Sequence, residues 1–322
     1  MTSWRFWGGF VMPHSLTVSV NRPPYGYNPY MTDTASTHDD LLEPYQPDWS
    51  VLETTNREGP FNEAGFYLLR ELAQITIVIA SLYPSVPLDR NRAILRGLVM
   101  RLAKLLRLTI RELSKKETFQ LLSIQRAILE AVGTLKYLIE DEDGSHFDQF
   151  VMNGLIAERE LLLTIQKNVR MREGAKLYIE TRMERSIQAT AEAAGITDVT
   201  SLEGRKKIGW PSAEARVKLL GTDAYVAYLT GSAETHGDWT DLYRNHLEYQ
   251  DGQFMPKPGY GDVRPQLTLT PAVLVANFLA KHADALIESD SAAYLIARLE
   301  DICERACGVT ELHEAMLARV AW

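Results

Sequence analysis

Two groups of polar residues in this chain have the types and the spacing that acid–base or phosphate chemistry requires. Arg126 and Glu130 stand four residues apart in an otherwise apolar segment, so their side chains can touch on one face of a helix. Tyr228, Ser232 and His236 follow one another at intervals of four residues, which places them in line on one helical face. An imidazole can hold or move a proton near neutral pH, and a guanidinium can pair with phosphate oxygens. Together the two groups predict a polar site between helices.

We assign a role to each of six residues. The candidate catalytic residues are His236, Arg126 and Glu130, and the candidate ligand-binding residues are Tyr228, Ser232 and Tyr225. A structural interpretation stays open, because a buried charge needs a partner and the Arg126–Glu130 pair can serve to fix helix register. A histidine near a helix end, such as His236, often caps the helix or packs in the core. No cofactor is expected.

Other chemistries fit the sequence less well. Four potential metal ligands lie within eleven residues, and they are His236, Asp238, Asp241 and His246. Their spacing matches no metal-binding motif, so no metal site is predicted. Cys303 and Cys307 lack a second Cys or His pair and are expected to be small core residues. The chain contains no Gly-x-Ser-x-Gly, Gly-x-Gly-x-x-Gly or P-loop sequence, which argues against a hydrolase elbow and the common nucleotide-binding folds.

The composition is that of a globular protein. Apolar residues make up 46% of the 322 residues and charged residues 24%, a balance that can fill a core. Two cysteines cannot build a disulfide scaffold, so a cytoplasmic location is expected. The net charge of −8 argues against general nucleic-acid binding and leaves room for a local basic surface. No apolar run of about 18 residues is free of charge, so neither a membrane helix nor a membrane partner is expected.

The apolar periodicity predicts an all-α fold, a multi-helix bundle with a long central helix. Residues 88–210 contain no proline over 123 positions. The expected helices are 62–82, 89–113, 117–139, 147–194, 222–235, 271–287, 291–307 and 311–321. We expect an interruption of the long helix near Gly174, and we expect Thr270 to cap a helix that Pro271 opens. Residues 249–270 are expected to form a loop that could cover His236.

The N-terminal region is rich in proline. Seven of the fourteen prolines lie between residues 13 and 60, and each fixes φ and lacks a backbone donor. Residues 1–58 are therefore expected to form a mobile, disordered or loosely docked arm, and residues 59–322 a single all-helical domain. We also hypothesise that Met31 is the biological start, in which case residues 1–30 are not part of the native product.

The helix expected at residues 89–113 has a basic face opposite its apolar one. Residues 88–116 hold nine Lys or Arg against two Asp or Glu. The basic face consists of Arg90, Arg96, Arg101, Lys104, Arg107, Arg111 and Lys115. Such a face can hold the phosphates of a nucleic acid or a nucleotide. The commoner case is a solvated face that acids elsewhere offset, and residues 33–63 supply eight acids against one arginine.

Two helical patterns together resemble one known family. They are Arg126-x-x-x-Glu130 followed by Tyr137, and Tyr228-x-x-x-Ser232-x-x-x-His236. The family consists of all-helical, mostly bacterial proteins known as a domain of unknown function, and the resemblance, over residues 65–285, implies a helical bundle. More distantly, the later helix is similar to the HEPN group, many of which are metal-independent RNases in toxins and antiviral defence. The HEPN signature has an arginine four to six residues before the histidine. Residues 229–235 contain none, so Arg126 would have to replace it from another helix.

These features predict a cytoplasmic helical protein with an inter-helical site for a phosphate-bearing ligand, RNA or a nucleotide. In a metal-independent RNase of a defence or toxin type, His236 would act as acid or base and Arg126 would stabilise the phosphate. The alternative is a non-catalytic interaction or scaffold protein in which the same residues form a structural network. Both are compatible with a homodimer. They differ in geometry, because a site needs the His236 ring close to Arg126 and Glu130 and open to solvent.

Overall fold

The computed structural model describes residues 41, 43–82, 87–115, 120–259, 263–287 and 289–320. The chain divides into two units, Met1–Ala35 and Ser36–Trp322, and every described residue belongs to the second unit. The predicted arm up to residue 40 and the hypothesised start at Met31 lie outside the described residues.

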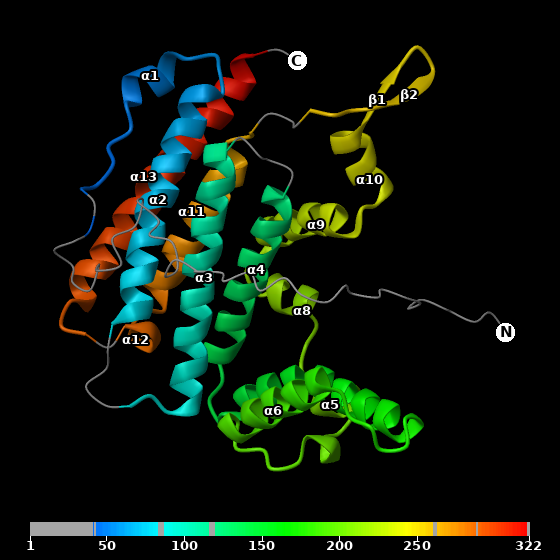
Figure 1. The fold of residues 1–322 in the computed structure, drawn as a ribbon. Coiled ribbons are helices and arrows are strands. Elements are labelled where there is room, and N and C mark those ends of the chain that lie inside the picture. The colour runs from blue at the N-terminus through cyan, green and yellow to red at the C-terminus, as the bar shows by residue number, and fades with distance from the viewer. Residues whose placement is uncertain are drawn as a thin grey trace, which may run out of the picture. The chain divides into compact units, whose positions relative to one another are not determined.

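Helices make up most of the described chain, and the predicted all-α class is confirmed (Figure 1). The long helices are α2 (Gly59–Ser81), α3 (Arg90–Lys115), α4 (Leu121–Ile139), α5 (Ser145–Met171), α6 (Tyr178–Ala193), α9 (Thr222–His236), α11 (Gln266–Lys281) and α13 (Ala292–Arg319). The short ones are α1 (Trp49–Thr54), η2 (Val199–Ser201), α7 (Arg205–Ile208), α8 (Ala213–Lys218), α10 (Trp239–Asp241), η3 (Leu242–His246) and α12 (Ala283–Leu286). Strands β1 (Leu247–Gln250) and β2 (Gln253–Pro256) form an antiparallel hairpin.

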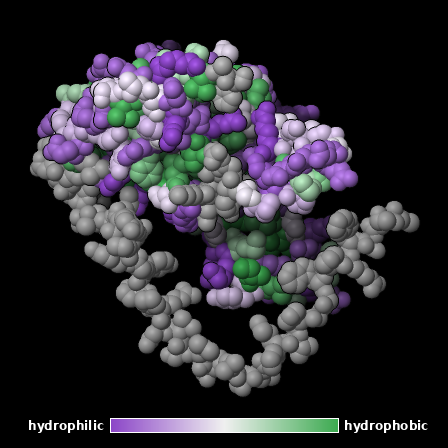
Figure 2. All heavy atoms as spheres, turned by 90° about the horizontal axis from the view of Figure 1, so that it is seen from above, coloured by the Kyte–Doolittle hydropathy of each residue, from purple (hydrophilic) through white to green (hydrophobic). Residues whose placement is uncertain are grey.

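The apolar faces of α2, α3, α4, α11 and α13 meet in one core. On α2, Phe61, Leu68 and Leu72 are completely buried, at the spacing of one helical face. Figure 1 shows α2 beside α3 and α13, and both helices pack directly on it. In the view of Figure 2, hydrophilic residues cover most of the described surface, and hydrophobic residues appear between them in smaller groups.

By length and composition, α2 is the one helix among the described residues that could cross a membrane. Two thirds of its most apolar window, 67%, is buried inside this fold. The core helix of a globular protein has the same property, so α2 is weak evidence for a membrane span.

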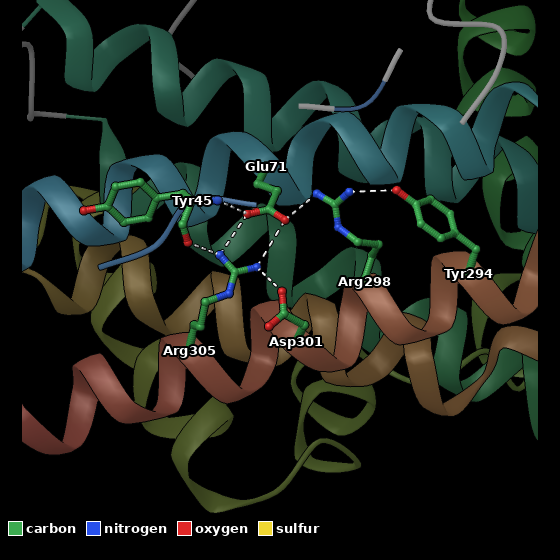
Figure 3. Close-up of polar contacts among 6 residues, drawn as sticks. All are labelled: Tyr45, Glu71, Tyr294, Arg298, Asp301 and Arg305. Carbon is green, nitrogen blue, oxygen red and sulfur yellow. Dashed lines mark hydrogen bonds and ion pairs between the residues drawn. The ribbon is translucent and has the colours of Figure 1, made fainter. Parts of the chain in front are cut away.

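A buried ion pair joins α2 to α13 (Figure 3). The Glu71 carboxylate, on a residue only 2% exposed, accepts hydrogen bonds from Arg298 at 2.7 Å and from Arg305 at 3.0 and 3.1 Å. Asp301 pairs with Arg305 at 2.5 Å. Tyr45, in the segment before α1, donates its backbone N–H to Glu71 at 3.2 Å and accepts at its carbonyl from Arg305. Because a buried charge is costly when it loses its partner, this network fixes α2, α13 and the Tyr45 segment relative to one another.

The packed chain begins before residue 59, within the stretch predicted as an arm. Leu52 of α1 is 2% exposed and belongs to the main core. A Cβ atom on Gly308 of α13 would lie 3.1 Å from the Trp49 ring, so α1 sits directly on that helix. With the Tyr45 contacts, residues 43–58 are docked on α2 and α13.

The C-terminal helix differs from its prediction. The sequence predicts two helices that part after Cys307, but α13 is continuous from Ala292 to Arg319. Gly308 stays helical because its missing side chain makes room for the Trp49 ring, and Val309 next to it is completely buried. Tertiary packing here overrides the low helix propensity of glycine.

The predicted cap at Thr270 is also wrong, because α11 begins at Gln266 and contains Pro271. The first turn packs tightly on α2, where a Cβ on Gly65 would lie 2.1 Å from the Thr268 hydroxyl. This burial outweighs the hydrogen bond that a proline cannot make inside a helix. The predicted interruption near Gly174 is confirmed, since α5 and α6 separate there and Gly174 has a φ of +93°.

Replacing Glu71 by Gln is expected to lower the free energy of unfolding by about 3–5 kcal/mol, because two buried guanidinium groups lose their anion. The matched control is Asp301→Asn, which removes another partner of Arg305. Because the Asp301 side chain is 43% exposed, this substitution is expected to cost about 1 kcal/mol or less. Urea unfolding of the three proteins measures both. Equal effects of the two substitutions would contradict the role given to Glu71.

Candidate functional site

The site lies where α9 crosses α4 on the side away from the main core. α4 is covered on this side by α8 and α9 and on its other sides by α3 and α11 (Figure 1). Gly231 of α9 makes the crossing close, because a Cβ there would lie 2.5 Å from the Leu122 carbonyl oxygen and 2.8 Å from Cβ of Arg126. Gly133 of α4 plays the same part against α8, with the Arg216 carbonyl oxygen at 2.9 Å. The two glycines let α4 pack closely against both helices.

Arg126 joins three of the predicted site residues. Its Nε donates to Glu130 Oε1 at 2.9 Å, within α4. Nη2 lies 3.4 Å from the Tyr228 hydroxyl, and the guanidinium carbon lies 5.1 Å from the centre of the Tyr228 ring. Nη1 lies 3.4 Å from Nε2 of His236. The structure therefore brings His236, Arg126, Glu130 and Tyr228 together, at distances where one charge influences the next.

His236 stands at the open end of this group. It is the last residue of α9, and Gly237 follows with a φ of +60°, the left-handed conformation that ends many helices. The His236 side chain is exposed, whereas that of Arg126 is 17% exposed. Because arginine only donates hydrogen bonds, Nε2 of His236 is the acceptor in this contact. The imidazole thus presents a lone pair to the guanidinium at a solvent-facing edge.

The other two predicted residues are less directly placed. The Tyr225 hydroxyl donates to Glu214 of α8 at 2.8 Å, and its ring lies under the Lys218 ammonium at 4.7 Å. Tyr225 also stacks on Tyr228 at 6.5 Å, so it contacts the Arg126 group only indirectly, through Tyr228. Ser232 is half-buried, and its hydroxyl forms no hydrogen bond with any residue that the structure describes.

Arg216 was not among the predicted site residues, yet it lies near the group and interacts electrostatically with Glu130 and Tyr228. Its Nε donates to Thr134 at 3.1 Å, its Nη1 donates to the Pro211 carbonyl, and it lies 4.7 Å over the Trp210 ring. Burial lowers the pKa of Arg216, although the nearby Glu130 carboxylate and the Tyr228 hydroxyl oppose this. The sequence carries no signal for it, because a short helix with two basic residues is commonplace.

Glu234 is a second residue that the sequence does not reveal. Its carboxylate accepts from the backbone N–H of Ser123 at 2.6 Å, at the start of α4, where the preceding Gln120 makes no side-chain cap. Burial raises the pKa of Glu234 to about 7, against the Ser123 hydrogen bonds and with a small contribution from Asp241. A cap supplied from 111 residues away leaves no pattern in the local sequence.

The chain after His236 forms more than a loop. The region predicted as a loop from 249 to 270 contains part of the β1–β2 hairpin, closed by a tight turn in which Asp251 and Gly252 have positive φ. Four exposed rings gather on α10, η3 and the hairpin: Trp239, Tyr243, Tyr249 and Phe254. The centres of adjacent rings lie 4.6 to 5.9 Å apart. We call this group the aromatic cluster.

The structure also bears on the other chemistries. Asp241 and His246 lie 3.6 Å apart, but among the described residues no group of three His, Cys, Asp or Glu side chains is placed to hold a metal ion. Cys303 and Cys307 are free thiols on α13, and Cys303 packs against the main core as predicted.

The fold and this site define an all-α protein with a polar group between two closely crossed helices. Residues 92–254, which are 163 of the 322, match the model of a family of unknown function, DUF5677, so the chain belongs to that family. The predicted membership of an uncharacterised family is thereby confirmed. The match includes Arg126, His236 and their neighbours. Neither the curated proteins nor the solved structures yielded a match.

Replacing Gly231 by Ala is expected to destabilise the protein by about 1–3 kcal/mol, because the new methyl group would push α9 away from the Leu122 carbonyl. Gly154→Ala in the exposed part of α5, where a Cβ meets nothing within 4 Å, is the matched control and is expected to stabilise by about 0.5–1 kcal/mol. Thermal and urea unfolding of the two variants measure the loss of stability in one and the gain in the other. A stabilising Gly231→Ala would show that the helices do not cross this closely.

Glu234→Gln is expected to change how stability depends on pH. With a folded pKa of about 7 against an ordinary 4.5, the folded protein holds a proton that the unfolded chain releases. The free energy of unfolding of the natural protein should therefore fall, relative to that of the Gln variant, as pH rises from about 4.5 to 7, and stay level above that. Urea unfolding of both proteins at several pH values measures the difference, and a constant difference would contradict burial of this carboxyl group.

Proposed function

We propose that the group around Arg126 binds a phosphate-bearing ligand, RNA or a nucleotide, and cleaves RNA without a metal ion. The observation that carries the proposal is the contact between the Arg126 guanidinium and Nε2 of the exposed His236, 3.4 Å apart. Both outer nitrogens of Arg126 are held by long contacts of 3.4 Å. A phosphate oxygen can replace these contacts with shorter, charge-assisted hydrogen bonds.

The geometry suits an RNA cleavage in which the 2′-oxygen forms a bond to phosphorus and the bond from phosphorus to the 5′-oxygen breaks. Arg126 would stabilise the negative charge that grows on the phosphate oxygens. His236 would take the proton from the 2′-hydroxyl or give one to the leaving 5′-oxygen, and water would accept or supply the other proton. Glu130 holds Arg126 in place through Nε. In this proposal Arg126 comes from α4 and takes the place of the arginine that a HEPN-type helix carries before its histidine.

The aromatic cluster supports a ligand that carries bases. It begins at Trp239, three residues after His236, and its rings are 47 to 60% exposed. Exposed rings of this kind stack on unpaired bases with little regard to sequence. The setting that we propose is the cytoplasm of a bacterium, where the two free thiols of α13 stay reduced.

The second candidate function is a non-catalytic scaffold, and one observation favours it. Arg126 already has three side-chain contacts, and Gly231 sits against its Cβ atom, as in a network that serves to lock α9 on α4. In that case Arg126 and His236 would be structural residues.

The test is cleavage of a labelled single-stranded RNA by the full chain in the presence of a chelator. Arg126→Gln and His236→Asn are each expected to slow cleavage by about 10²–10⁴-fold without lowering the melting temperature. Arg182→Gln, an exposed arginine of α6, is the control and should cleave normally. Undiminished cleavage by both site variants would refute the proposal. Absent cleavage and phosphate binding in the natural protein, with a lower melting temperature in both variants, would establish the scaffold.

A further inference from the structure

The outer face of α3 carries a continuous row of positive charge. We call Arg101, Lys104, Arg107, Arg111 and Lys115 the basic stripe. Its members are three or four residues apart, so each side chain neighbours the next along the helix, and the row is about 21 Å long at 1.5 Å per residue. Four of the five are exposed, and Arg107 is half-buried.

Most of the basic stripe has no acidic partner among the residues that the structure describes. The side chains of Arg101, Lys104 and Arg107 form no ion pair or hydrogen bond with any described residue. Arg111 and Lys115 share a single carboxylate, that of Glu112, at 3.1 and 3.9 Å. Three like charges in a row repel one another, and a polyanion would relieve this repulsion.

The acids before residue 64 do not offset the stripe where the structure describes them. Asp48 accepts from Ser50 and Val51 at the start of α1, and Glu58 lies 3.6 Å from His313 of α13. The acids that pair with α3 outside the stripe come from other places, such as Asp148 of α5 on Arg90. No described acid of residues 43–63 forms an ion pair with the side chain of Arg101, Lys104 or Arg107. The other acids of the predicted range 33–63, Asp33, Asp39 and Asp40, lie outside the described residues.

We infer that the basic stripe holds the phosphate backbone of the RNA that the Arg126 site acts on. This inference rests on the proposed function and narrows its ligand class from "RNA or nucleotide" to a polynucleotide. α3 packs directly on α4. Lys115 ends α3, Leu121 begins α4 after a short connection, and Arg126 stands five residues, about 7.5 Å, further along α4. One strand can thus contact the stripe and the site, whereas a mononucleotide has too few phosphates to contact both.

An anionic membrane fits the same face less well. A helix that lies on a membrane surface inserts its apolar side between the lipids. The apolar side of α3 is closed inside the core, where Val99, Leu102 and Leu106 are completely buried. Only the charged side remains free, which suits a polyanion in solution.

The test uses the full chain and the triple variant Arg101→Gln, Lys104→Gln and Arg107→Gln. The matched control removes the same charge from exposed positions of α5 and α6, as Lys167→Gln, Arg170→Gln and Arg182→Gln. The probes are a fluorescent 12-nucleotide single-stranded RNA and AMP, at 50 to 200 mM NaCl. In the stripe variant the slope of log K against log salt for RNA should shrink by about 2, because each phosphate that a cation neutralises contributes about 0.7 to the slope. AMP binding should be unchanged, and the control should keep the natural slope.

Each contrary outcome has a separate meaning. If AMP binds and Arg126→Gln abolishes that binding, but the stripe variant keeps the natural RNA slope, the inference fails and the proposed function stands. If neither AMP nor RNA binds the natural protein, both fail. If the slope shrinks as much in the control variant as in the stripe variant, net charge and not the stripe is responsible, and the inference fails. The inference also fails if vesicles with anionic lipids or poly-glutamate displace the RNA from the stripe at equal charge concentration.

Discussion

The close crossing of α9 over α4 is the constraint on which the candidate site depends. Only glycine fits at position 231, because the Leu122 carbonyl lies 2.5 Å from where a Cβ would be. The crossing lets a side chain from each helix reach the other. Arg126 of α4 meets His236 and Tyr228 of α9, and Glu234 of α9 caps the start of α4. The close packing of the two helices therefore brings the residues of the site together.

That arrangement explains why the structural and functional interpretations are hard to separate by inspection of contacts. Arg126 contributes to packing through its Cβ, its stem and Glu130, but its outer nitrogens contact a hydroxyl and an imidazole at 3.4 Å. A residue needed for stability alone is normally held by short bonds in a dry setting, as Arg305 is by Glu71 and Asp301. Arg126 differs in part: its bond to Glu130 is equally short, at 2.9 Å, but its two outer nitrogens have only the 3.4 Å contacts, one of them to the exposed His236.

How much the sequence predicted depended on whether the cause was local. The i, i+4 spacing placed Arg126 beside Glu130 and set Tyr228 and His236 on one face, and both expectations are confirmed. The glycine break at Gly174 is local too, and it was predicted. The errors at Gly308 and Pro271 arose because a distant element, Trp49 in one case and Gly65 of α2 in the other, decides the outcome. Glu234 was missed for the same reason, since its partner is a backbone N–H on another helix.

The family match has a boundary that does not coincide with the core. Residues 92–254 contain all but the first two residues of α3, all of α4 and α9, and the site. The core side of α3 and α4 is packed against α2 and α11, and Glu71 of α2 pairs with arginines of α13. Helices α2, α11 and α13 lie outside the matched residues. Val99, Leu102 and Ile128 would lose much of their cover if those helices were absent. The flanking helices therefore supply the apolar surface that holds α4 in place, while the matched region supplies the polar groups that α4 presents to α9.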